Sequence, residues 1–137
     1  MMDLSGKYNS IAVIEIKIMT LANEGYSVKF NLQRKIMSWR DYYMWNNNFT
    51  RAISEDSCCL IEETLPKIGV IEWMIEYNDG LTDEIESKSS VPGEWRISLE
   101  FDDGTKLTSG AEESFPKDWN SLRILIEKIT GCSFVLH

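Results

Sequence analysis

Apolar and polar residues alternate along two neighbouring segments near the start of the chain. In the first segment, charged residues separate isoleucines at every second position, Ile14, Ile16 and Ile18. The second segment repeats this period after a short break with Tyr26, Val28, Phe30 and Leu32. A strand that is buried on one face has a period of two. The two segments therefore predict a β-hairpin.

The stretch from 34 to 51 is rich in aromatic residues, which favour strands over helices. They are Trp39, Tyr42, Tyr43, Trp45 and Phe49. Three consecutive asparagines, Asn46, Asn47 and Asn48, predict a turn inside the stretch. We expect one or two further strands here.

Two helices are predicted from their start and stop signals. Ser54 is a good N-cap, and Cys58, Ile61, Leu65 and Ile68 follow at helical spacing. Pro66 should stop or kink this helix near Leu65, with the chain leaving at Gly69. The second helix starts near Pro116 and ends at Gly131. Its apolar positions are Trp119, Leu122, Ile126 and Ile129.

Alternation returns in two later segments. Ile71, Trp73, Ile75 and Tyr77 predict a strand, followed by a turn at 78–80 and a polar return segment at 81–90. The run from Trp95 to Phe101 leads through Asp102-Asp103-Gly104 into 106–108, which is the clearest hairpin pattern in the chain. The segments at 73–80 and 95–104 resemble each other, but any two amphipathic strands with tight turns share these features. We expect 134–136 to form a short edge strand.

Strands outnumber helices in this order, and their connections look like hairpins. The chain is therefore expected to fold as an α+β protein, with an antiparallel β-sheet of about five to seven strands and two amphipathic helices packed on one face. Residues 10–137 are expected to form a single domain. Residues 1–9 look like a flexible polar lead.

Charge is unevenly distributed along the chain. Residues 54–94 carry eleven acidic side chains and two basic ones, whereas residues 1–53 carry seven basic and four acidic ones. A surface of one sign steers the encounter with a partner of opposite charge. The net charge of −8 disfavours nucleic acid, whose phosphates require clustered bases. A basic protein partner fits better.

Side chains for catalysis and metal binding are sparse. The single histidine is His137, and Cys58, Cys59 and Cys132 lack the spacing of metal ligands. We interpret the cysteines as small buried hydrophobes. No glycine-rich phosphate-binding motif is present. We therefore expect no cofactor, no metal site and no catalytic residues.

Carboxylates remain the one candidate for an active site or a Ca²⁺ site. The obvious cluster is Asp79, Asp83, Glu84, Glu86, Asp102 and Asp103. Residues 79–83 do not match the ligand spacing of an EF-hand loop. Asp before Gly is also what a tight hairpin turn prefers. A carboxylate-based enzyme or a metal-binding protein is therefore only our third alternative.

Two kinds of segment in a sequence indicate where a protein is located, the secretory signal and the membrane span. The start lacks the basic and apolar regions of a secretory signal, so a cytoplasmic location is expected. No apolar run approaches the length of a membrane span, so no membrane partner is expected.

A tryptophan strand, an Asp-Asp-Gly turn and a proline-started helix that ends in Thr130-Gly131 follow one another between Glu94 and Gly131. In these features, and in its size and acidity, the chain resembles small bacterial α+β proteins. Many of these are uncharacterised, and some are immunity proteins of toxin systems. The resemblance suggests this setting and transfers no functional residue.

The leading hypothesis is a non-enzymatic protein-binding module, and most specifically an immunity-type inhibitor that caps a basic partner. The expected partner-binding residues are Glu62, Glu63, Asp79, Asp83, Glu84 and Glu86. Trp39, Tyr43 and Trp45 form a candidate second face, provided that they are exposed. The alternative is a structural or self-associating domain in which the basic half of one copy meets the acidic half of another, giving a homo-oligomer.

Overall fold

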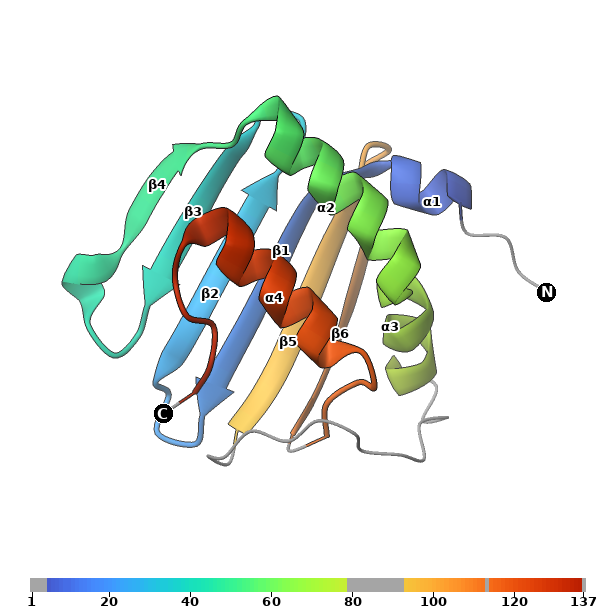
Figure 1. Cartoon of the computed structure of the whole chain (residues 1–137). Coiled ribbons are helices and arrows are strands. Elements are labelled where there is room, and N and C mark those ends of the chain that lie inside the picture. The colour runs from blue at the N-terminus through green and yellow to red at the C-terminus, as the bar shows by residue number, and fades with distance from the viewer. Residues whose placement is uncertain (1–4, 79–92, 113, 137) are drawn as a thin grey trace.

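A computed structural model of the chain describes residues 5–78, 93–112 and 114–136. These residues form a six-stranded antiparallel sheet with helices on one face (Figure 1). The strand order is β4-β3-β2-β1-β5-β6. The strands are β1 (Ile11–Thr20), β2 (Gly25–Asn31), β3 (Ile36–Asp41), β4 (Phe49–Ala52), β5 (Gly93–Phe101) and β6 (Lys106–Glu112). The helices are α1 (Ser5–Asn9), the 3-10 helix η1 (Trp45–Asn47), α2 (Glu55–Ile68), α3 (Val70–Asn78) and α4 (Trp119–Thr130). The α+β prediction is confirmed.

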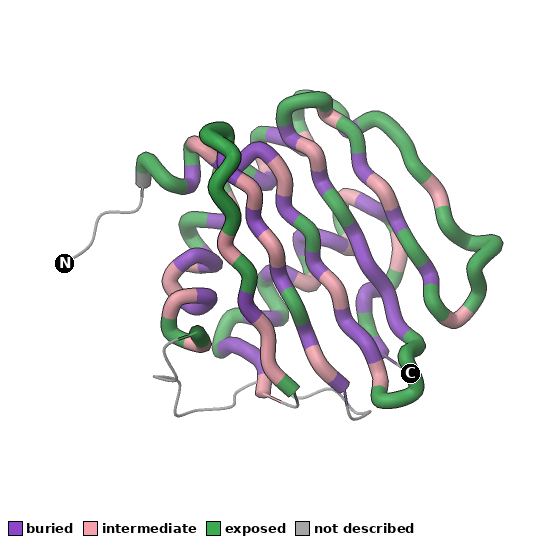
Figure 2. Tube along the Cα trace, turned by 180° about the vertical axis from the view of Figure 1, so that it is seen from behind, coloured by how far each residue is buried: buried purple, intermediate pink, exposed green. Residues whose placement is uncertain are grey.

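The core lies between the sheet and the helices. Ile16 on β1 pairs with Val28 on β2 and with Ile97 on β5, and all three side chains are buried. Because side chains alternate along a strand, Glu15 and Lys17 point to the other face. No helix of the described segments covers that face, which is turned to the viewer in Figure 2. The predicted hairpins 11–32 and 95–108, and the turn at Asn46–Asn48, are confirmed.

Residues 71–77 form helix α3, so the predicted strand is wrong. Val70, Ile71, Trp73 and Met74 are the buried side chains of this segment. Their spacing places them on one side of a helix, whereas Met74 would point outward from a strand. The similar segment that starts at Trp95 is a strand, so the two segments are not a structural repeat. The predicted turn and return segment at 79–90 lie outside the described residues.

Helix α2 continues past Pro66 to Ile68, one turn further than Leu65. Gly69 ends it in the left-handed region with φ of 82°, as predicted. Proline removes one N–H donor from the helix ladder. Since Pro66 lies in the last turn, the helix lacks only the hydrogen bond that an N–H at position 66 would donate.

Both ends of the described chain pack more closely than expected. Residues 5–9, expected as part of a loose lead, form helix α1 with Tyr8 buried. Residues 134–136 form no strand, which corrects the expectation of an edge strand. Instead, Phe134 and Leu136 are buried in the core, and the Phe134 N–H donates to Glu127 Oε2 at 2.7 Å. Burial of two large apolar side chains replaces the strand pairing.

Candidate interaction surfaces

Helix α2 presents a face of exposed carboxylates. Cys58, Ile61, Leu65 and Ile68 are its buried residues, so the helical period turns the opposite side to solvent. Four acidic side chains are exposed there, Glu55, Asp56, Glu62 and Glu63. We call these four residues the acidic α2 face.

The local sequence fixes the orientation of this face. The Ser54 hydroxyl accepts a hydrogen bond from the Ser57 N–H at 3.1 Å and caps the helix. Glu55 and Asp56 lie in the first turn, where the helix dipole favours negative charge. Glu55 also forms an ion pair with Lys35. Glu62 and Glu63 form no ion pair within the described residues and are available to a partner.

The structure locates only two of the six predicted partner-binding acids. Glu62 and Glu63 lie side by side on α2 and are exposed. Asp79, Asp83, Glu84 and Glu86 fall outside the described residues. Over residues 55–78 the helical layer holds six acidic side chains and one basic residue, Lys67.

The uncovered face of the sheet carries a row of basic residues. Arg40 on β3 pairs with Ser27 on β2, Ser27 pairs with Lys17 on β1, and Lys17 pairs with Arg96 on β5. Acidic residues lie in the adjoining rows, where Glu94 contacts Arg96 at 3.8 Å. This row and the acids of α2 thus lie on opposite sides of the sheet, whereas Lys35 and Arg51 reach the helical side.

The predicted aromatic face does not form as a unit. Trp39 is 3% exposed and belongs to the core, where it contacts Phe134. Tyr43 is half-buried against Tyr26, with 5.3 Å between their ring centroids. Trp45 is 83% exposed. Only Trp45 of the three is available to a partner.

Exposed apolar residues next to Trp45 were missed by the sequence reasoning. Tyr42 and Met44 are 37% and 55% exposed. Leu21, in the β1–β2 turn, is 77% exposed. Alternation assigns an aromatic residue to one face of a strand, but it does not show where the strand ends and the loop begins. The run of three asparagines was the only signal of a loop here.

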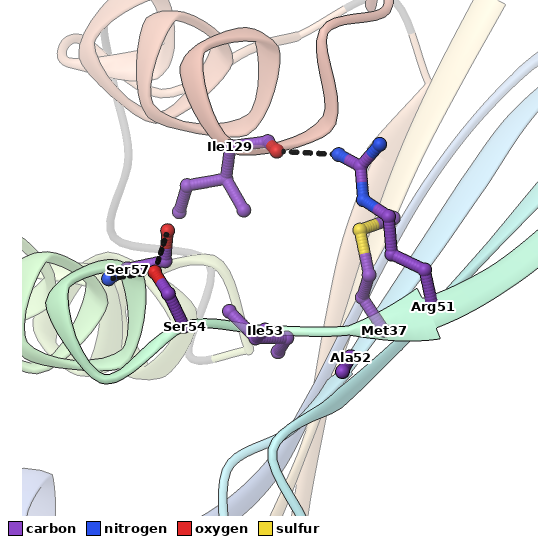
Figure 3. A pocket seen from close by; sticks show the side chains of 7 residues that line it. All are labelled: Met37, Arg51, Ala52, Ile53, Ser54, Ser57 and Ile129. Carbon is purple, nitrogen blue, oxygen red and sulfur yellow. Dashed lines mark hydrogen bonds between the residues drawn. The ribbon is translucent and has the colours of Figure 1, made fainter.

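A pocket of about 220 Å³ opens between the end of β4, the start of α2 and the end of α4 (Figure 3). It is lined by Met37, Arg51, Ala52, Ile53, Ser54, Ser57 and Ile129. The Arg51 guanidinium donates to the carbonyl oxygens of Ile129 at 2.8 Å and Thr130 at 3.0 Å. These carbonyls belong to the last turn of α4, whose dipole favours a cation. Arg51 therefore joins β4 to α4 and serves the fold.

The remaining reactive groups are dispersed. Within the described ranges, no three histidine, cysteine or acidic side chains are grouped so that they could hold a metal ion. Cys58 is buried, and burial raises the pKa of its thiol. Cys59 is exposed and Cys132 half-buried, so the expectation of buried cysteines is wrong for Cys59. None of the helices in the described part of the chain has the length and apolarity that a membrane crossing requires.

Asp103 has a structural role in the β5–β6 turn. Its Oδ1 accepts hydrogen bonds from the Thr105 hydroxyl at 2.6 Å and from the Thr105 N–H at 2.9 Å. These bonds favour the carboxylate and lower the pKa of Asp103. The Asp-Asp-Gly segment thus stabilises the turn.

Comparison of the chain with protein-family models, curated proteins and solved structures finds no match.

Proposed function

We propose that this chain is a non-enzymatic protein-binding module that uses the acidic α2 face to bind a basic protein. The observation that carries the proposal is the exposure of Glu62 and Glu63 on a helix whose other side is anchored in the core. A rigid face of one charge sign raises the rate of encounter with an oppositely charged partner. The specific form that we propose is an immunity-type inhibitor that acts in the bacterial cytoplasm and covers a basic surface of its target.

Charge reversal on α2 tests this proposal. Glu62→Lys with Glu63→Lys should leave the fold intact, since both side chains are exposed in the middle of the helix. Asp102→Lys with Glu112→Lys is the matched control, because it changes the net charge equally at exposed positions away from α2. Wild-type and variant proteins would be used to capture partners from lysate at low salt, with elution at high salt.

The proposal expects one basic protein, in stoichiometric amount, from the wild type and the control but not from the α2 variant. A basic protein captured equally by all three baits would show that net charge, rather than the acidic α2 face, drives binding. An eluate without any basic protein would reject the proposal.

Self-association is the second candidate function. The basic row on the uncovered sheet face, with Arg40, Lys17 and Arg96, favours it because this row could meet the acidic α2 face of another copy. Such a contact is heterologous and would give rings or open chains of subunits. Sedimentation at low salt and high protein concentration tests it, and a monomer under these conditions would reject it.

A further inference from the structure

The connection between β3 and β4 contains three exposed, large apolar side chains within four consecutive residues. Tyr42, Met44 and Trp45 are 37%, 55% and 83% exposed. We call these three residues the aromatic loop. Single exposed apolar residues are ordinary, whereas three within four consecutive residues make this loop a candidate interaction site.

Hydrogen bonds hold the aromatic loop in one conformation. The buried Asp41 carboxylate accepts from the Tyr43 N–H at 2.8 Å, from the Met44 N–H at 2.9 Å and from Asn47 Nδ2 at 3.1 Å. Asn48 Oδ1 in turn accepts from the Asp41 N–H at 2.7 Å. Trp45 is therefore presented to solvent by an ordered backbone. A pre-organised loop loses little conformational entropy when it binds.

An unpaired strand edge continues from this loop. β4 is the last strand of the sheet and has a strand neighbour on one side only. The Ile53 N–H donates to the Lys35 carbonyl at 2.8 Å. With the register of β3 and β4, this bond shows that every second residue of β4, Phe49 and Arg51, is hydrogen-bonded to β3. In this alternation the backbone N–H and C=O groups of Thr50 and Ala52 point away from β3. These groups can pair with one added strand.

The other edge of the sheet is partly covered. Helix α3 packs on β6, and Asn78 Nδ2 donates to the Thr108 carbonyl oxygen at 3.0 Å. Among the described residues, β4 is thus the edge that is open to a partner. Strand addition at such an edge gains affinity from main-chain hydrogen bonds and specificity from neighbouring side chains.

Charge indicates what kind of segment would bind there. Of the four basic residues between Arg34 and Arg51, Lys35 is paired with Glu55 and Arg51 binds the end of α4, so the exposed Arg34 and Arg40 remain. The one acidic residue of this stretch, Asp41, is buried and accepts hydrogen bonds from the loop. Lys17 lies over the Tyr42 ring, with its Nζ at 5.2 Å from the ring centroid. Pairing β4 with β4 of a second copy would bring two basic segments together, whereas an acidic segment complements this charge.

We propose that the β4 edge and the aromatic loop bind an extended acidic segment of a partner protein by strand addition. An apolar side chain of this segment packs on Met44 and Trp45, and its carboxylates lie on the side of Arg40, which is on the neighbouring strand β3. This site does not include Glu62 and Glu63, the acids that carry the proposed function, and would give the module a second partner of opposite charge.

The experiment uses a display library of random short peptides, selected on the immobilised full chain. The proposal expects enriched peptides that combine acidic and apolar residues. Trp45→Ala should weaken the binding of the best peptide by about 30-fold, as expected for a central tryptophan anchor. The substituted side chain is exposed, so the fold should persist.

A second variant tests strand addition itself. Ala52→Pro removes an outward N–H donor at an edge position, where proline is tolerated. It should weaken the binding of the peptide by about 10-fold or more, because one hydrogen bond and the packing around it are lost. Ile124→Ala, an exposed apolar position on α4, is the matched control and should bind as the wild type does. Glu62→Lys with Glu63→Lys should also retain peptide binding, which separates this site from the acidic α2 face.

Three results would overturn the proposal. The first is a library that yields no enriched acidic peptide. The second is a peptide whose Kd is unchanged by both Trp45→Ala and Ala52→Pro. The third is a concentration-dependent dimer of the wild type, seen by sedimentation, that Trp45→Ala abolishes, because the occupant would then be a second copy of this chain.

Discussion

Replacing Tyr8 with phenylalanine should destabilise the fold through one buried hydroxyl. The Tyr8 hydroxyl donates to Glu72 Oε2 at 2.7 Å and accepts from the Ile71 N–H at 2.9 Å. It thereby connects the short helix α1 to the start of α3. Ile71 lies in the first turn of α3, where backbone N–H groups have no partner within the helix. Tyr8→Phe keeps the ring and removes only these two bonds.

The expected loss follows from what each partner does afterwards. The Ile71 N–H is buried, and a buried donor without a partner costs about 1–3 kcal/mol. Glu72 is only partly buried, so water can replace the lost bond to its carboxylate and little is added. We expect the free energy of unfolding to fall by about 2 kcal/mol. With a urea dependence of about 2 kcal/mol/M, the midpoint should fall by about 1 M.

Urea unfolding followed by tryptophan fluorescence measures this change. Trp39, Trp73, Trp95 and Trp119 are buried and report on the core. Tyr42→Phe is the matched control, because its ring is partly exposed, and it should alter the midpoint by less than about a quarter of that amount. A Tyr8→Phe midpoint that equals the wild-type value would refute the role of this hydroxyl.

Two further predictions concern the stability of the fold. Burial raises the pKa of Tyr8, Tyr26 and Tyr77, so their ionisation favours the unfolded chain. The free energy of unfolding should be constant below about pH 10 and fall as the pH rises further. An unfolding midpoint that is flat from about pH 8 to 11 would contradict this expectation. Ser54→Ala removes the cap of α2 and should lower the free energy of unfolding by about 1 kcal/mol, whereas Ser54→Gly should lower it by only a few tenths. Equal losses in the two Ser54 variants would argue against the cap.

Hydrophobic periodicity predicted the sheet because most strands are buried on one face only. The alternation of Ile14, Ile16 and Ile18 corresponds to side chains that face the helices. The same reasoning failed at 71–77, where Val70, Ile71, Trp73 and Met74 also fit a helical face. Periodicity alone cannot separate the two patterns in a short segment. Tertiary packing decides, since α3 lies on β6 and Trp73 contacts Trp119 at a centroid distance of 6.5 Å.

The candidate surfaces were predictable to different degrees. The exposure of Glu62 and Glu63 follows from the helical spacing of the apolar residues around them. The exposure of Trp45 and the burial of Trp39 do not follow from composition, because both residues lie in one aromatic stretch. They depend on where β3 ends and on the hydrogen bonds of Asp41. An open strand edge depends on the order of strands, which the sequence pattern does not specify.

The binding role of the acidic α2 face is best tested by the rate of association with the captured basic partner, measured by stopped flow at low and at high ionic strength. We expect the wild-type association rate constant to fall by about 10-fold or more as salt is raised, because screening removes the attraction of the acidic α2 face. Glu62→Lys with Glu63→Lys should associate slowly at low salt and respond weakly to salt. A wild-type rate that is insensitive to salt, or a variant that retains the wild-type salt response, would show that the acidic α2 face does not steer binding.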